Sequence, residues 1–270
     1  MILASATSLS LFAGLPAAII YALVALLGGR LPEHQTHRLV VIGWVLHGLS
    51  VGVSLGNGDD GLIRFGFAPA LSTTAWLVLL FYLLERQWFP LLRARWTLAS
   101  LGVVSVLLPL VFPGQALHTS ASVWLPLHWA LGLASYGLFA AAVIHAWLMV
   151  RTETQIRLAA EPQTGVPLLT LERLTFRFVL AGFVLLSATL LEGWWFGDVL
   201  YGPEKAWRWD HKTIFSLLAW LTFAGLLLAR HQLGWRGRKA ARVLYIGAGL
   251  LLLAYVGSRF VLEVVLVRPA

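Results

Sequence analysis

The sequence predicts an all-α polytopic membrane protein, a helical bundle of about eight transmembrane helices with both termini outside. Three observations predict this class. Hydrophobic residues make up 59% of the 270 residues and charged residues only 12%, with a mean hydropathy of +0.80, more apolar surface than a water-soluble domain buries. The apolar residues gather in runs of roughly 20, the length of a membrane-spanning helix. Basic residues concentrate in alternate connections between these runs.

The predicted spans follow the apolar runs along the chain. The first run lacks a basic leader and a small-residue cleavage motif, so we expect a retained span rather than a removed signal peptide. The connection 151–177 mixes Glu, Gln, Thr, Gly and Pro and is predicted to hold a short surface helix at Leu168–Arg173. We expect one transmembrane domain over residues 1–270. Its spans are at about 9–28, 38–55, 67–84, 97–112, 125–150, 177–195, 213–229 and 243–265.

The distribution of Lys and Arg predicts the orientation in the membrane. Alternate connections hold most of these residues, which makes that side cytoplasmic by the positive-inside rule. A multi-pass protein of the bacterial inner membrane is expected, and these connections explain the net charge of +8 without nucleic-acid binding. The chain has no cysteine, which excludes disulfides, thiolate metal sites and covalent c-type haem attachment. The basic residues on the other side are Arg64, Lys205, Arg208, Lys212, Arg259 and Arg268.

A tryptophan-rich segment, residues 194–212, is predicted to lie outside the membrane. It reads W-W-F-G-D-V-L-Y-G-P-E-K-A-W-R-W-D-H-K. Indole faces stack on a planar conjugated ligand, and Arg208 or Lys212 would meet carboxylates of that ligand. Tryptophan belts also anchor membrane proteins at the lipid–water interface whatever their function. The residues open to both interpretations are Trp194, Trp195, Trp207 and Trp209.

Histidines inside a bundle are informative because ionisable groups are costly there. His47 follows Arg38 by about 13 Å of helix, near mid-membrane, where it either forms an interhelical hydrogen bond or ligates a cofactor. Imidazole is the common axial ligand of haem iron, but these histidines equally suit a proton relay or plain packing. Glu192 and Glu263 lie near span ends, where snorkelling to water would explain them. The histidines sort into an outer set, His118, His128 and His211, and a deeper set, His47, His145 and His231.

Four segments carry a resemblance to a known family. W-R-W-D-H-K-T-I-F-S-L-L-A-W at Trp207–Trp220 and A-R-H-Q-L-G-W-R-G-R-K-A-A at Ala229–Ala241 resemble the cytochrome c assembly family, membrane haem handlers of the CcsA and CcmC type with HemX and YpjD relatives. F-A-P-A-L-S-T-T-A-W-L at Phe67–Leu77 and A-Y-V-G-S-R-F at Ala254–Phe260 look most similar to the YpjD branch. The resemblance covers essentially the whole chain.

The resemblance implies haem handling or transfer, or cytochrome c maturation, with haem b bound non-covalently. His128 would be an external iron ligand beneath the tryptophans, and His231 a ligand near the inner face with His47 as its candidate partner. Trp207, Trp209, Asp210 and Lys212 match the family's W-x-W-D-x-K core. Partners would be haem, membrane lipid, and an apocytochrome or another assembly protein.

The chain departs from the family pattern in two places. No histidine follows Tyr255, where haem-export members carry a second external ligand, so His118 or His211 would substitute. The family's W-D-P-K-E is W-D-H-K-T here. No nucleophile–base pair, nucleotide loop or hydrolase metal spacing occurs, so no enzymatic activity is expected. The alternative function is a haem-free scaffold or regulator, as in a HemX-like influence on tetrapyrrole synthesis.

Overall fold

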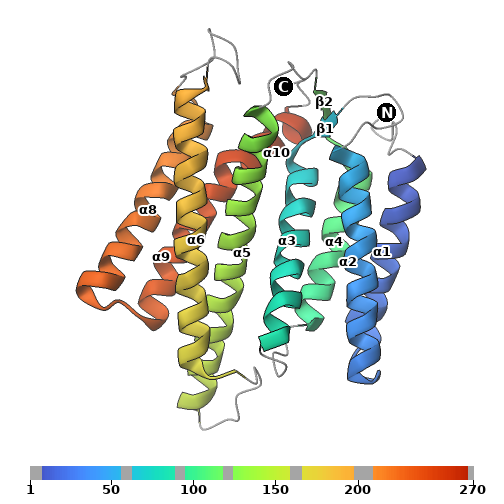
Figure 1. Ribbon diagram of the computed structural model, residues 1–270, viewed down its shortest axis with the longest axis horizontal. Coiled ribbons are helices and arrows are strands. Elements are labelled where there is room, and N and C mark those ends of the chain that lie inside the picture. Colours follow the sequence, from blue (N-terminus) through green and yellow to red (C-terminus); the bar gives the residue numbers. More distant parts are fainter. Residues whose placement is uncertain are drawn as a thin grey trace. The chain divides into compact units, whose positions relative to one another are not determined.

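The computed structural model describes residues 8–55, 63–88, 95–117, 124–158, 166–197 and 209–266, and these are almost entirely helical (Figure 1). Six helices are long and apolar enough to cross a membrane, which confirms the all-α polytopic class. Each of the eight apolar runs contains a helix, and the two helices outside this count have apolar parts that the structure describes over Leu11–Leu27 and Leu98–Val111. The number of crossings and the outer position of the termini stay predictions. The helices are α1 (Ser8–Leu27), α2 (Glu33–Leu55), α3 (Phe67–Trp88), α4 (Arg95–Val111), α5 (Trp124–Arg157), α6 (Leu168–Trp195), α8 (His211–Leu233) and α9 (Gly237–Leu252).

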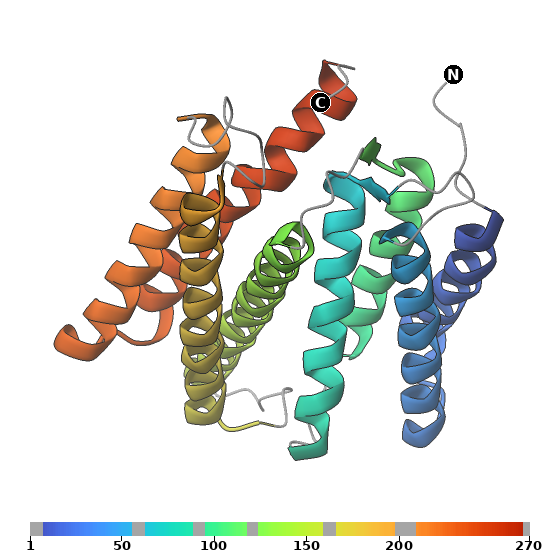
Figure 2. The same ribbon diagram turned by 45° about the horizontal axis from the view of Figure 1, so that its top comes forward.

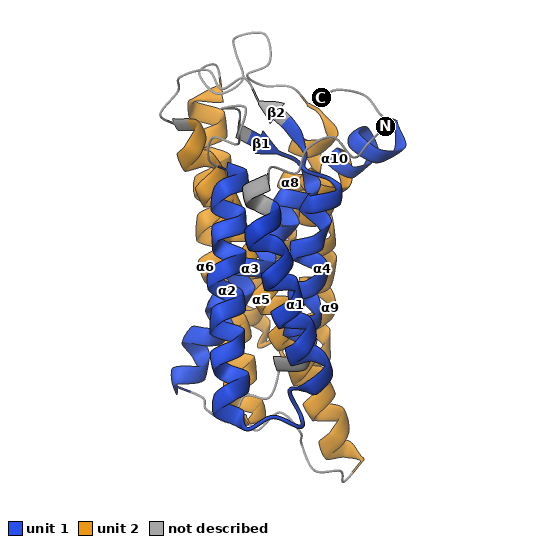
Figure 3. Cartoon of the chain, turned by 90° about the vertical axis from the view of Figure 1, so that its right-hand side faces the viewer, with its two compact units in different colours: residues 1–119, 259–270 blue, residues 120–258 orange. Residues whose placement is uncertain are grey.

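The chain divides into two compact units (Figure 3). Unit 1 comprises residues 1–119 and 259–270, and unit 2 comprises residues 120–258. In unit 1, α1 packs against α2 and α4, and α3 completes the ring by packing against both of these helices. In unit 2, α5 packs against α6 and α9 in the same way, and α8 completes the ring. Both units therefore join four sequential helices in the same neighbour order.

An aromatic ring fills a slot between glycines in unit 1. Tyr21 on α1 is completely buried, and a Cβ added to Gly43 or Gly102 would stand 2.9 or 2.8 Å from its ring. Small residues let neighbouring helices approach closely in membranes. Trp44 and Trp76 join α2 to α3: their rings stack 5.1 Å apart, and each indole N–H donates to the other residue's backbone carbonyl, at 3.2 and 3.1 Å.

Unit 1 also contains two short strands that an all-α prediction omits. β1 (Ile63–Phe65) pairs antiparallel with β2 (Gln115–Leu117) in the register Ile63↔Leu117. Three-residue strands separated by about fifty residues leave no periodic pattern in the sequence. Gly114 before β2 has φ of 79°, and its close approach to Phe65 leaves no room for a side chain.

The last helix of the chain belongs to both units. It continues from α9 through the π-helical segment η1 (Leu253–Gly257), α10 (Ser258–Phe260) and the π-helical segment η2 (Val261–Val265), drawn in red in Figure 2. In unit 1, Phe260 packs edge-on against Phe67 with the ring centroids 5.3 Å apart. The Glu263 carboxylate lies against Gly66 and accepts a hydrogen bond from the backbone N–H of Phe67, at the start of α3.

Two phenylalanine rings form the centre of unit 2. Phe139 of α5 and Phe223 of α8 stack with centroids 3.8 Å apart, and both are completely buried. Gly182 of α6 faces Phe139 and Gly247 of α9 faces Phe223, so that a Cβ on either glycine would contact a ring. All four helices of the unit thus meet at one aromatic pair.

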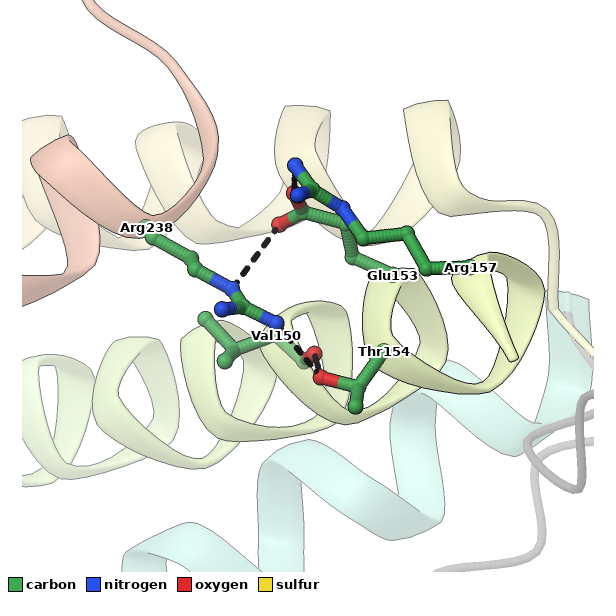
Figure 4. A network of polar contacts seen from close by, with 5 residues as sticks. All are labelled: Val150, Glu153, Thr154, Arg157 and Arg238. Atoms are coloured by element: carbon green, nitrogen blue, oxygen red, sulfur yellow. Dashed lines mark hydrogen bonds and ion pairs between the residues drawn. The ribbon is translucent and has the colours of Figure 1, made fainter.

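Ion pairs close one end of unit 2, here called the basic end: the end of α5, the start of α6 and the turn between α8 and α9. Arg230 contacts Glu172 at 2.6 Å. Arg238 donates to the Thr154 hydroxyl at 2.8 Å and pairs with Glu153, which also pairs with Arg157 (Figure 4). The turn itself needs two glycines, because Gly234 and Gly237 have φ of 63° and 57°.

The start of α6 differs from the sequence prediction. No separate surface helix covers Leu168–Arg173, because these residues are the first turns of α6, which continues without a break to Trp195. Pro167 precedes the helix, and its carbonyl accepts the first helical hydrogen bonds from Thr170 and Leu171. The charges of Glu172 and Arg173 suggest a solvated segment, but Glu172 is buried by its ion pair with Arg230.

Candidate functional site at the tryptophan end of unit 2

The end of unit 2 opposite the basic end brings together residues from three helices. This tryptophan end comprises the start of α5, the end of α6 and the start of α8 (Figure 1). His128 lies in the second turn of α5 with 13% of its side chain exposed. Its Nδ1 atom is 3.6 Å from Oε2 of Glu192 on α6, and the Lys212 ammonium on α8 acts on it electrostatically. An imidazole, a carboxylate and a cation therefore converge here.

Glu192 lies near the end of α6, as the sequence predicts, but its environment differs from the predicted one. Snorkelling would carry its carboxylate to water, but only 7% of the side chain is exposed. In the described part of the chain neither carboxylate oxygen has a hydrogen-bond partner, and Oε2 contacts the imidazole of His128. A buried carboxylate is costly without a partner. Sequence reasoning missed this pairing because the two residues are 64 positions apart, and only the depth common to both residues indicates it.

Three described tryptophans of this end are exposed. Trp194 and Trp195 at the end of α6 are 63% and 76% exposed, and Trp209 before α8 is 67% exposed. Trp194 and Trp195 meet edge to face, with centroids 6.4 Å apart, so the two rings are not stacked on each other. Trp207, Arg208 and His118 lie outside the described residues.

The first residues of α8 have distinct environments. Asp210 is the N-cap, and its side chain accepts a hydrogen bond of 2.9 Å from the backbone N–H of Thr213. The carboxylate therefore stabilises the start of the helix. His211 is exposed, whereas Lys212 is half-buried.

The deeper set of histidines is divided between the two units. His47 belongs to unit 1, where it is completely buried and its Nε2 atom is 2.9 Å from the Ser72 hydroxyl. This is the interhelical hydrogen bond that the sequence offers as one of two roles. Its Nδ1 atom has no hydrogen-bond partner in the described residues. A role for this residue as an iron ligand stays a prediction.

His231 and His145 lie elsewhere in unit 2. His231 is exposed in the last turn of α8, at the basic end and therefore far from His128. His145 is buried on α5, where its Nδ1 atom is 2.8 Å from the backbone carbonyl of Ala141. His231 belongs to unit 2 and His47 to unit 1. Their predicted pairing as iron ligands stays a prediction.

The residues of the tryptophan end fit a haem group. Haem iron takes imidazole as an axial ligand, its ring stacks on indole, and its propionates pair with cations. His128, the exposed tryptophans and Lys212 supply these three groups at one end of one unit. The buried carboxylate of Glu192 adds the partner that iron-ligating histidines commonly have on their second nitrogen.

Comparison with known proteins points to one family. The model of the family described as "Cytochrome C assembly protein" matches residues 35–266. Inner membrane protein YpjD of Escherichia coli K12 is 29% identical over 169 residues, 62% of this chain and 63% of the relative. An uncharacterised 28.8 kDa protein from the nifR3-like 5′ region of Azospirillum brasilense is 32% identical over 73% of this chain and 76% of its own length. The cytochrome c biogenesis protein CcsA of Synechococcus sp. WH7803 is 27% identical over 62% of this chain and 53% of the relative. The match thus spans somewhat less than two thirds of YpjD and about half of CcsA.

Proposed function

The chain belongs to the cytochrome c assembly protein family, and from this premise we propose that it takes part in cytochrome c maturation by binding haem b and presenting it at the tryptophan end of unit 2. It is a multi-pass protein of the bacterial inner membrane. The binding is non-covalent, because the chain has no cysteine for a thioether bond. Partners in this proposal are haem, membrane lipid, and an apocytochrome or another assembly protein.

The observation that carries the proposal is the environment of His128. The imidazole lies at the end of a helix, nearly buried, with a carboxylate on one side and a cation close by. An ionisable cluster of this kind inside a membrane protein marks a functional site more often than plain packing. Haem at this position would be bound by His128 through its iron and by Lys212 through its propionates.

In this proposal the other residues of the tryptophan end bind the propionates and the face of the haem ring. Lys212, together with Arg208, meets the propionates. Trp194, Trp195, Trp207 and Trp209 contact the ring face. Asp210 fixes the first turn of α8, and with it Lys212, through its capping bond. A second iron ligand would come from His211 or His118, or from a group of the partner that receives haem.

The alternative is a haem-free scaffold or regulator, and the exposure of the tryptophans also suits it. Indole side chains that are more than 60% exposed at helix ends are typical of an interfacial belt. This function would leave the buried pair His128–Glu192 without a ligand. It needs no change in the fold.

Visible absorption spectroscopy separates the two functions. The protein is purified in mild detergent from haem-replete cells, oxidised and reduced, as wild type, His128→Ala and His145→Leu. We expect a Soret band and sharp reduced α and β bands in the wild type, a loss of most of that absorbance in His128→Ala, and retention in His145→Leu, which removes the buried imidazole of the same helix. A flat wild-type spectrum from folded, monodisperse protein would instead support the scaffold.

A further inference from the structure

We propose that Glu192 is a positioning residue for haem at the tryptophan end: its carboxylate would accept a hydrogen bond from Nδ1–H of His128, which leaves Nε2 as the nitrogen that would bind the iron. The inference rests on the proposed function of His128 as an iron ligand. It assigns a role to a residue that contacts neither the ring nor the iron.

The burial of Glu192 is the first argument. A carboxylate that is 7% exposed near the end of a membrane helix needs a donor. The other described carboxylates of unit 2 all have one: Glu153 and Glu172 pair with arginines, and Asp210 accepts from a backbone N–H. For Glu192 the group that the described residues bring within reach is the imidazole of His128.

The orientation of the ring is the second argument. Nδ1 of His128 faces Glu192, and a Cβ added to Gly193 would lie 3.4 Å from the Cε1 atom. Two consecutive residues of α6 thus lie beside one edge of the imidazole. Nε2 is the ring nitrogen that remains for iron once Nδ1 is committed to the carboxylate.

The distance between Nδ1 of His128 and Oε2 of Glu192 suits a contact that shortens when haem binds. At 3.6 Å the pair is about 0.6 Å longer than a normal N–H···O hydrogen bond. Polar contacts in ligand-free sites are often long and tighten in the complex. A histidine that donates to a carboxylate is fixed in one tautomer and becomes a more basic ligand, which stabilises ferric iron.

Titration of purified protein with hemin tests this inference. The variants are wild type, Glu192→Gln and Glu172→Gln, with His128→Ala as the test of the ligand itself. Glu192→Gln keeps the size of the side chain and removes its charge. Glu172→Gln is a matched control, because Glu172 is on the same helix and about 30 Å away along its axis. As whole residues, Glu172 and Glu192 are both 8% exposed.

Glu192→Gln should weaken ferric haem binding roughly 10- to 100-fold and raise the midpoint potential, whereas Glu172→Gln should change neither. Wild-type affinity, potential and ferric EPR spectrum in Glu192→Gln would overturn the inference and leave the proposed function standing. Unchanged hemin binding in His128→Ala would overturn both. Should Glu192→Gln not purify as folded protein, Glu192→Asp keeps the charge but withdraws it by one methylene. An intermediate loss of affinity in that variant is expected, and wild-type behaviour would again overturn the inference.

Discussion

Asp210 combines two properties that the sequence motif does not separate. Its side chain accepts a hydrogen bond from the Thr213 backbone N–H, so it is the N-cap of α8. Its negative charge also lies two residues from Lys212, the cation of the proposed haem site. A helix cap needs an acceptor oxygen rather than a full charge. The two properties are therefore separable by substitution.

Replacing Asp210 tests the capping role. Asp210→Ala should lower the free energy of unfolding by about 1 kcal/mol, because an N–H at the start of α8 loses its acceptor. Asp210→Asn keeps an acceptor and should retain most of the stability. Thermal unfolding of both variants in detergent, followed by circular dichroism, provides the measurement. Equal losses in both variants would show that the charge rather than the cap stabilises the protein.

Paired glycines and aromatic rings determine how closely the helices pack in both units. In unit 2 the glycines Gly182 and Gly247 admit the stacked rings of Phe139 and Phe223. In unit 1 Tyr21 occupies the corresponding slot between glycines of α2 and α4. Interfaces of this kind depend on the absence of a methyl group, since packed interiors leave no space for one.

Gly247→Ala should destabilise unit 2. The added Cβ would stand 2.6 Å from Cε1 of the buried Phe223 ring, and overpacking of this kind costs about 1–3 kcal/mol. Gly249→Ala, on the same helix, is the control, because among the described residues no atom outside the local helix backbone lies within 4 Å of its Cβ position. Thermal unfolding should show a lower midpoint for Gly247→Ala and no decrease for Gly249→Ala. A similar decrease in both variants would indicate an effect on the helix rather than on packing.

The sequence predicts the helices well because a single long apolar segment in a membrane satisfies its own backbone hydrogen bonds only as a helix. It predicts the positions of His128 and Lys212 at a common level for the same reason, since helix rise converts residue number into depth. It does not predict which side chains face one another. The β1–β2 pair, the contact of Glu192 with His128 and the ion pair of Glu172 with Arg230 all join distant segments, and the two side-chain contacts depend on how the helices are rotated.

Unit 2 has ends of opposite chemical character. Arginines paired with Glu153 and Glu172 gather at the basic end, and exposed tryptophans gather at the tryptophan end. The positive-inside rule predicts that the basic end faces the cytoplasm. The proposed haem site would then open to the periplasm, where c-type cytochromes would receive their haem.

The absence of native cysteine makes this orientation directly testable. Single cysteines are introduced at two exposed positions of α8, His211→Cys at the tryptophan end and Gln232→Cys at the basic end. A membrane-impermeant maleimide applied to cells with a permeabilised outer membrane should label the first variant, and should label the second only after lysis. The reverse pattern would place the tryptophan end in the cytoplasm and exclude delivery of haem to the periplasm from this site.

The last helix has a consequence for biogenesis. Residues 259–266 complete unit 1 through Phe260 against Phe67 and Glu263 at the start of α3. A ribosome therefore finishes unit 2 before it releases the residues that finish unit 1, although most of unit 1 is synthesised first. During membrane insertion unit 1 therefore stays incomplete until residues 259–266 have been synthesised. A stop codon or a bulky fusion near Val261 should therefore destabilise unit 1, most of which is synthesised first, more than unit 2.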